Sequence, residues 1–257
     1  MQIDSGTDER SRDITLMRQV LKSGDSVIVY DDTKVSQISP DFFAPDHWQG
    51  ADQTTGKSGG RGAAIYINHA GQDWVLRHYY RGGLPGRVLS DQFLWTGATR
   101  TRSLREWDLL QLMVEQALPA PTPIAARYVR HGGFYTADLI TLRLPDVVPF
   151  SARLADGLAP LELWQRVGEC IARFHFAGFF HADLNAHNLQ VDSNDRVFLL
   201  DWDRGEWRAP GDWRTNNLER LHRSLLKITR DSAVHFDSAD WDVLLQAYSD
   251  VWSKLSD

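Results

Sequence analysis

The sequence predicts an α+β fold of two lobes, an antiparallel sheet with one main helix followed by a mostly helical half. Three observations support this division of the 257 residues. Short runs of β-branched and aromatic residues dominate the first half, at 27–30, 64–67, 74–77, 124–129 and 134–144. One stretch with helical spacing of apolar residues interrupts them over 101–118; these residues are Leu104, Trp107, Leu110, Met113, Val114 and Ala117. In the second half, helical spacing of apolar residues predicts three further helices, at 161–176, 216–229 and 240–255.

These patterns divide the chain into three parts. We expect residues 1–25 to form an N-terminal extension with one short helical stretch, 26–145 the N-lobe and 146–257 the C-lobe. The Gly132-Gly133 pair should turn the chain between the last two strands of the sheet. Leu144-Pro145-Asp146 then follows as the expected hinge between the lobes.

The most informative stretch is His181-Ala182-Asp183-Leu184-Asn185-Ala186-His187-Asn188, with the pattern H-x-D-L-x-x-x-N. A helical repeat precedes it, and a predicted hairpin follows it and ends on Asp201. Protein-kinase-like phosphotransferases arrange their catalytic loop and metal-binding aspartate in this way. We therefore expect a protein-kinase-like fold in which Asp183 orients the attacking hydroxyl and His181 braces the loop. Asn188 and Asp201 would hold Mg²⁺ beside the phosphates of ATP. The alternative, a solvated loop whose side chains only cap turns, agrees less well with the flanking helix and hairpin.

A glycine-rich segment precedes the strand at 64–67. Its Gly-Lys-Ser at 56–58 is typical of a P-loop, but Ala51 stands where that motif needs its first glycine. A P-loop also lies between a strand and a helix, whereas a strand follows here. We interpret Gly59, Gly60, Arg61 and Gly62 as a turn whose amides cover the phosphates of ATP. A plain turn is the alternative.

Arg77 ends a strand at the position where kinases carry the lysine of V-A-I-K. A guanidinium can bridge phosphate oxygens with two N–H groups. Glu106 lies beside the apolar face of the helix over 101–118, and we expect it to pair with Arg77. An ordinary surface ion pair, or none, is the alternative. The basic loop that follows, with Arg81 and Arg87, is either a site for an anionic substrate or a solvated turn.

Composition and charge bear on partners and location. A net charge of −6 argues against nucleic acid as a partner. Cys170 is the only cysteine, so an internal disulfide is impossible, and its helical context predicts a buried, inert thiol. Residues 1–13 do not resemble a signal peptide, and no run reaches the roughly 18–20 apolar residues of a membrane span. We expect a cytoplasmic protein whose membrane contact, if any, is peripheral. The tryptophans of 202–213 lie among arginines and are candidates to face lipid or sugar. The tryptophans and arginines around 202–230 form either an interfacial patch or a solvated helix face.

Several motifs together resemble one family. They are Gly59-Gly60-Arg61-Gly62, the segment Leu76-Arg77-His78-Tyr79-Tyr80-Arg81-Gly82-Gly83, the catalytic loop 181–188, Asp201-Trp202-Asp203-Arg204, and Asn217-Leu218-Glu219-Arg220-Leu221-His222-Arg223-Ser224-Leu225. From about residue 27 to 230 the chain resembles the 3-deoxy-D-manno-octulosonic acid (Kdo) kinases of Gram-negative bacteria. The resemblance implies a kinase fold, ATP with Mg²⁺, and phosphate transfer to a hydroxyl of the Kdo sugar on a lipid A precursor. It also implies peripheral contact with the cytoplasmic face of the inner membrane.

Details of the sequence agree with a glycolipid acceptor. Protein kinases usually have lysine two residues after the catalytic aspartate, where this chain has Asn185, and no Ala-Pro-Glu segment follows Asp201. We expect Arg81, Arg87 and the arginines of 204–223, Arg204 among them, to bind the carboxylate and phosphates of the acceptor. Asn185 is expected to contact the acceptor as well. Trp202-Asp203 replaces the Phe-Gly of kinases and leaves open whether Asp203 joins the metal site.

Two other functions stay open on the sequence. One is a phosphotransferase for soluble sugars or aminoglycosides, although a cationic acceptor would favour an acidic cleft. The other is a non-catalytic pseudokinase that binds nucleotide, against which the intact Asp183, Asn188 and Asp201 argue.

Overall fold

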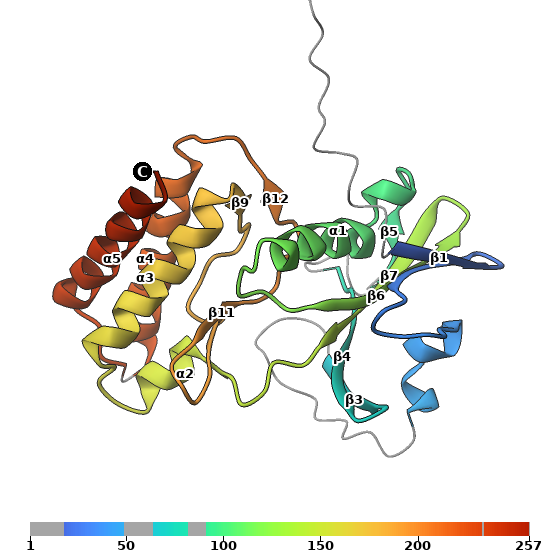
Figure 1. Ribbon diagram of the computed structural model, residues 1–257, viewed down its shortest axis with the longest axis horizontal. Helices are drawn as coiled ribbons and strands as arrows, with labels where there is room; N and C mark the ends of the chain where they lie inside the picture. Colours follow the sequence, from blue (N-terminus) through green and yellow to red (C-terminus); the bar gives the residue numbers. More distant parts are fainter. Residues whose placement is uncertain (1–17, 49–63, 82–90, 233, 257) are drawn as a thin grey trace, which may run out of the picture.

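The computed structural model describes residues 18–48, 64–81, 91–232 and 234–256. Figure 1 shows two lobes side by side, a sheet with α1 on one side and a group of helices on the other, joined through residues 143–147. This agrees with the predicted α+β, kinase-like architecture. The proposed boundaries of the lobes stay an interpretation of the sequence.

The N-lobe is an antiparallel sheet with strand order β1-β2-β6-β7-β4-β3, and β5 pairs with the start of β7. Its strands are β1 (Arg18–Ser23), β2 (Ser26–Asp31), β3 (Ala64–His69), β4 (Gln72–His78), β5 (Phe93–Leu94), β6 (Pro123–His131) and β7 (Phe134–Leu142). On β4 the buried Trp74 and Leu76 alternate with Arg77, whose side chain therefore leaves the opposite face. The β6–β7 turn falls at Gly132-Gly133 as expected, and Gly132 has a φ of 62°, which glycine adopts without steric cost.

Strand β1 corrects the expectation of an extension that ran to residue 25. Residues 18–23 pair with β2, from Arg18 opposite Asp31 to Ser23 opposite Ser26. The strand lies at the edge of the sheet and nearly all of it is exposed. Backbone hydrogen bonds rather than an apolar repeat define such a strand, so hydrophobic periodicity gave no signal for it. Residues 1–17 lie outside the described part of the chain.

Helix α1 (Arg102–Glu115) packs against β6 and β7 and ends three residues before the predicted limit. Ala117, with a φ of 52°, donates its N–H to the Val114 carbonyl at 3.0 Å. Leu118 donates to the Met113 carbonyl at 2.9 Å, which completes a Schellman cap. Leu118 is buried beyond the helix end, and for this reason the apolar pattern continued past the true boundary.

The C-lobe contains four helices among the described residues, together with short strands near the lobe interface. These elements are β8 (Val148–Pro149), α2 (Phe150–Ala155), α3 (Leu161–Phe176), β9 (Phe179–Phe180), β10 (Leu189–Val191), β11 (Val197–Leu199), β12 (Glu206–Trp207), α4 (Trp213–Asp231) and α5 (Ser238–Ser256). Helices α3, α4 and α5 lie alongside one another (Figure 1). The backbones of α3 and α5 approach closely at Gly168, where a Cβ atom would lie 2.2 Å from the Leu244 carbonyl oxygen.

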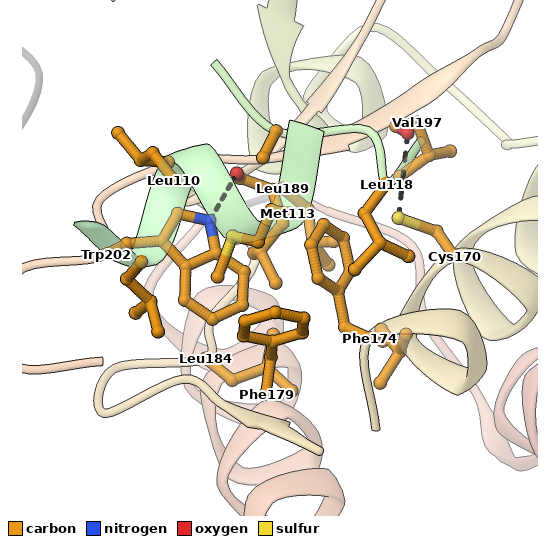
Figure 2. Close-up of a cluster of buried hydrophobic side chains, with 14 of the residues drawn as sticks. Leu110, Met113, Leu118, Cys170, Phe174, Phe179, Leu184, Leu189, Val197 and Trp202 are labelled. Carbon is orange, nitrogen blue, oxygen red and sulfur yellow. Dashed lines mark hydrogen bonds between the residues drawn. The ribbon is translucent and has the colours of Figure 1, made fainter. Parts of the chain in front are cut away.

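A shared apolar core connects α1 to the C-lobe, as Figure 2 shows. Leu110 and Met113 of α1 meet Phe174 and Trp202 there, and the Trp202 indole donates to the Leu199 carbonyl at 2.9 Å. The Cys170 thiol is buried and donates to the Val197 carbonyl at 3.5 Å. Burial raises the pKa of this thiol to about 12, as expected for an unreactive structural cysteine. Within the described ranges, no helix combines the length and apolar character needed to cross a bilayer.

Candidate active site

The side chain of His181 holds the catalytic loop against the end of β11. Its Nε2 donates to the Leu200 carbonyl at 2.8 Å, and its Nδ1 accepts the Asp183 N–H at 3.1 Å. The ring is buried, and burial lowers the pKa of His181. A neutral imidazole can donate from one nitrogen and accept at the other, as both contacts require. The geometry supports the predicted bracing role.

A buried chain of hydrogen bonds ties three helices to this loop. The Tyr248 hydroxyl of α5 donates to His175 Nδ1, and His175 Nε2 donates to Asn217 Oδ1, both at 3.1 Å. Asn217 Nδ2 then donates to the His181 carbonyl at 2.8 Å. Burial lowers the pKa of His175 to about 4, so the ring is neutral at pH 7, in agreement with this direction of donors.

Asp183 lies at the surface of the loop and pairs with Arg220 of α4. Arg220 Nε donates to Asp183 Oδ1 at 3.1 Å, and Nη2 donates to the same oxygen. Burial by itself raises the pKa of Asp183, but the hydrogen bonds from Arg220 outweigh it and hold the pKa below its usual value. The carboxyl group is therefore ionised at neutral pH, and Arg220 holds it through Oδ1.

Asn185 and Asn188 shape the rest of the loop. Both donate from Nδ2 to the Asp183 carbonyl at 2.9 Å. Asn185 Oδ1 also accepts the backbone N–H groups of His187 at 2.9 Å and Asn188 at 3.0 Å. The Asn185 side chain thus stabilises the backbone of the loop, and its predicted contact with the acceptor stays a prediction. Donation by Asn188 Nδ2 orients this amide and leaves Oδ1 as its acceptor atom for a cation.

Arg77 is the centre of an ionic network between the lobes. It pairs with the buried Glu106 of α1, and its Nη1 donates to Asp201 Oδ1 at 2.9 Å. Tyr79 joins them, since its hydroxyl donates to Glu106 Oε2 at 2.6 Å and accepts from Arg77 Nη2 at 3.1 Å. Burial raises the pKa of Glu106 to about 7, although Arg77 acts in the opposite direction. The Arg77–Glu106 pair expected from the sequence is present.

Asp201 and Asp203 have the chemistry of a magnesium site. Asp201 has a φ of 62°, a left-handed conformation that non-glycine residues adopt mainly where the surrounding structure enforces it, and its side chain is half-exposed. Asp203 Oδ2 pairs with Arg102 Nη1 at 3.0 Å, whereas its buried Oδ1 has no hydrogen-bond partner in the described structure. Carboxylate and amide oxygens are the ligands that Mg²⁺ prefers. Asn188, Asp201 and the orphaned oxygen of Asp203 therefore fit this ion.

A cavity of about 290 Å³ lies next to the network, between β5, the start of α1 and residues 202–205. Four arginines and two carboxylates are among the residues that line it: Arg100, Arg102, Arg105, Arg204, Glu106 and Asp203. Glu106 pairs with Arg77, Asp203 with Arg102, and Arg105 lies 3.7 Å from Glu206, so the excess of positive charge in the cavity comes from Arg100 and Arg204. Such a site suits an anionic ligand.

The structure describes only some of the other residues predicted to bind the acceptor or the phosphates of ATP. Arg204 lines the cavity and is exposed, and Arg81 is exposed beyond the end of β4. Gly59, Gly60, Arg61, Gly62 and Arg87 lie outside the described residues, so their expected roles stay predictions.

Tyr79 was not among the residues predicted for the site, and Arg220, one of the arginines expected to bind the acceptor, contacts Asp183 instead. Tyr79 lies two positions after Arg77 and so shares its side of the strand, a signal that strand periodicity contains. Arg220 lies three and four residues from Asn217 and Ser224, both of which contact the loop. Helical spacing places the three on neighbouring positions of α4, but the sequence does not say which loop that face meets.

Comparison with known proteins identifies the family. The sequence profile of the lipopolysaccharide kinase (Kdo/WaaP) family matches residues 46–248. The chain belongs to this lipopolysaccharide kinase family. Among its relatives in the Kdo/WaaP family is a 3-deoxy-D-manno-octulosonic acid kinase of Stenotrophomonas maltophilia, 42% identical over 234 residues that cover 90% of this chain and 92% of the relative. The kinase of the same name from Vibrio parahaemolyticus is 35% identical, with 91% and 98% covered.

Solved structures agree with the kinase-like fold of this Kdo/WaaP family member. The structure of WaaP in complex with acyl carrier protein superposes with a TM-score of 0.52 at 16% sequence identity. The match covers 83% of this chain and 86% of WaaP. At this identity the likeness concerns the fold alone.

Proposed function

We propose that this lipopolysaccharide kinase transfers the γ-phosphate of ATP to a hydroxyl of the Kdo sugar on a lipid A precursor. The observation that carries the proposal is the assembly of Asp183, Asn188 and Asp201 at one end of the β10–β11 hairpin, opposite Arg77 of the N-lobe. Kinases need this combination of a hydroxyl-orienting carboxylate, metal ligands and a phosphate-binding cation. The proposed acceptor, a Kdo sugar, follows from the relatives that are named 3-deoxy-D-manno-octulosonic acid kinases.

In the proposed reaction, Asp183 accepts a hydrogen bond from the acceptor hydroxyl and takes its proton as the oxygen attacks the γ-phosphorus. The bond between this phosphorus and the oxygen that bridges it to the β-phosphate breaks, and ADP leaves. Asn188, Asp201 and Asp203 would hold Mg²⁺, which neutralises phosphate charge when bound. Arg77, positioned by Glu106 and Tyr79, braces the phosphates with N–H donors.

We assign the acceptor's anionic groups to the arginines around the cavity. Arg204 lines this cavity together with Arg102, and Arg81 and Arg87 come from the loop after β4. A Kdo carboxylate and the phosphates of lipid A are anions that arginine binds with two N–H groups. This charge argues against a cationic aminoglycoside as the acceptor.

The proposal places the enzyme at the cytoplasmic face of the inner membrane, where the acceptor's sugar is accessible and its acyl chains remain in lipid. Trp207 is 60% exposed, and Arg208 stacks on the ring of Phe180 nearby. Aromatic and basic side chains together favour a membrane interface, so peripheral contact is consistent with this surface.

Phosphate transfer from labelled ATP tests the proposal. The wild-type protein, with Mg²⁺, is offered a Kdo-bearing lipid A precursor, free Kdo and a generic protein as rival acceptors. We expect label on the glycolipid, and Asp183→Asn should reduce this transfer by about 1,000-fold with ATP binding retained. Label on free Kdo alone would indicate a soluble-sugar phosphotransferase. ATP binding without transfer to any acceptor would indicate the pseudokinase.

A further inference from the structure

The Arg220–Asp183 contact points to a role that the catalytic-loop motif does not contain. Arg220 belongs to α4, 37 residues after Asp183, and it directs both Nε and Nη2 to the same carboxylate oxygen. The loop has no cation of its own next to Asp183, because Asn185 occupies the lysine position of protein kinases. The Asn185 side chain instead makes hydrogen bonds to three backbone groups of the loop.

Helix α4 holds Arg220 in place from both sides. One turn before it, the buried Asn217 donates to the His181 carbonyl at 2.8 Å. One turn after it, Ser224 Oγ accepts the Ala186 N–H at 3.3 Å. Leu221 and Leu225 are fully buried on the same side of the helix. The base of the Arg220 side chain is therefore fixed relative to the catalytic loop at two points.

We propose that Arg220 is a positioning residue for phosphate transfer: its Nε and Nη2 hold Oδ1 of Asp183 so that Oδ2 faces the acceptor hydroxyl. The guanidinium thus supplies from another helix the positive charge that the loop itself lacks. The effect on turnover rests on the proposed function, whereas the effect on the ionisation of Asp183 does not.

The first test measures the ionisation of Asp183 without any acceptor. Carboxyl ¹³C NMR titration of the full chain, with Asp183→Asn to assign the signal, compares wild type with Arg220→Met and Arg220→Lys. We expect the pKa of Asp183 to rise in Arg220→Met, because the effect of burial is then no longer opposed by the hydrogen bonds and charge of Arg220. Arg220→Lys should give an intermediate pKa, since one ammonium keeps the charge without the two-pronged geometry. An unchanged pKa in Arg220→Met would refute the inference.

The second test measures turnover against pH. For Arg220→Met we expect about a 100-fold fall in kcat at neutral pH, little change in KM for ATP, and an acidic limb of the kcat profile moved to higher pH. Arg220→Lys should recover part of the rate. The matched control is Arg230→Met on the same helix, where the arginine is 75% exposed and pairs with the neighbouring Asp231. A purely structural role of Arg220 would lower the thermal midpoint and leave the acidic limb in place, which would contradict the proposal.

The two tests separate this inference from the proposed function. If the wild type transfers no phosphate to the glycolipid but the Asp183 pKa rises in Arg220→Met, the proposed acceptor is wrong and the positioning role stands. If the wild type is active and Arg220→Met matches Arg230→Met in both tests, the positioning role is wrong and the proposed function stands.

Discussion

Arg77 Nη1 donates to Asp201 Oδ1 at 2.9 Å, a contact between two residues that are 124 positions apart and belong to different lobes. The same guanidinium holds the buried Glu106 of α1. One side chain therefore fixes the relation among the sheet, the main N-lobe helix and the aspartate expected to bind metal. The catalytic constellation depends on this cross-lobe geometry as much as on the loop motif.

Removal of Arg77 should destabilise the protein by leaving Glu106 buried without its cation. We expect Arg77→Met to lower the free energy of unfolding by about 3 kcal/mol, measured by urea denaturation. The loss should grow as pH rises through 7, because the pKa of Glu106 increases further and the unfolded chain ionises more readily than the folded one. Arg77→Met/Glu106→Gln should recover most of the loss. Arg18→Met, at the exposed pair with Asp108, should cost under about 1 kcal/mol, and an equal cost for both arginines would contradict the argument.

Changes at Asp201 and Asp203 should separate their contributions to the metal site. Asp201→Asn is expected to raise the Mg²⁺ concentration for half-maximal activity by about tenfold or more. Asp203→Asn should have a smaller effect, since its Oδ2 is engaged by Arg102 and only Oδ1 is available. Calorimetric titration of Mg²⁺ into the ATP-bound protein measures the Mg²⁺ affinity of both variants directly. No change in Mg²⁺ affinity for Asp201→Asn would remove it from the site.

His175 should make stability fall in mild acid. Its pKa is about 4 in the folded protein and about 6.5 in the unfolded chain, so the unfolded chain binds the extra proton between these values. Stability is therefore complete above pH 6.5 and decreases as the pH falls toward 4, by about 3 kcal/mol from this residue. His175→Phe should be less stable at pH 8, because Tyr248 and Asn217 lose a partner, yet its stability should depend less on pH. His131→Gln, at an exposed site, is the control and should keep the wild-type pH slope.

Gly168 should tolerate no side chain. Alanine would place Cβ 2.2 Å from the Leu244 carbonyl oxygen and 3.1 Å from the Tyr248 nitrogen, both backbone atoms of α5. Because backbone atoms cannot rotate away, the helices must separate, and we expect Gly168→Ala to cost about 3 kcal/mol in thermal or chemical unfolding. Gly211→Ala is the matched control, since the nearest atom to its Cβ would be at 3.5 Å. Similar stability for the two variants would mean that α3 and α5 do not pack so closely.

The sequence alone determined the main elements of the fold and led to the predictions for the catalytic loop. Alternation of apolar and polar residues predicted β4 and the β6–β7 hairpin, and apolar residues at helical spacing predicted α1, α3 and α5. Burial of one face of a strand or helix imposes these periods on the sequence. The pattern of residues 181–188 and the aspartate after the following hairpin led us to predict His181, Asp183, Asn188 and Asp201 as site residues. The analogy with kinases predicted the pairing of Arg77 with Glu106, which is present.

Only the tertiary structure decided the contacts that no local pattern encodes. The edge strand β1 is formed by backbone pairing, so its exposed side chains give no periodic signal. Arg220 meets Asp183 because Asn217 and buried leucines dock α4 on the loop. Packing also pairs one oxygen of Asp203 with Arg102 and leaves the other buried without a partner among the residues that the structure describes. Such contacts join residues far apart in sequence, and their partners are set by packing rather than by the spacing of residues along the chain.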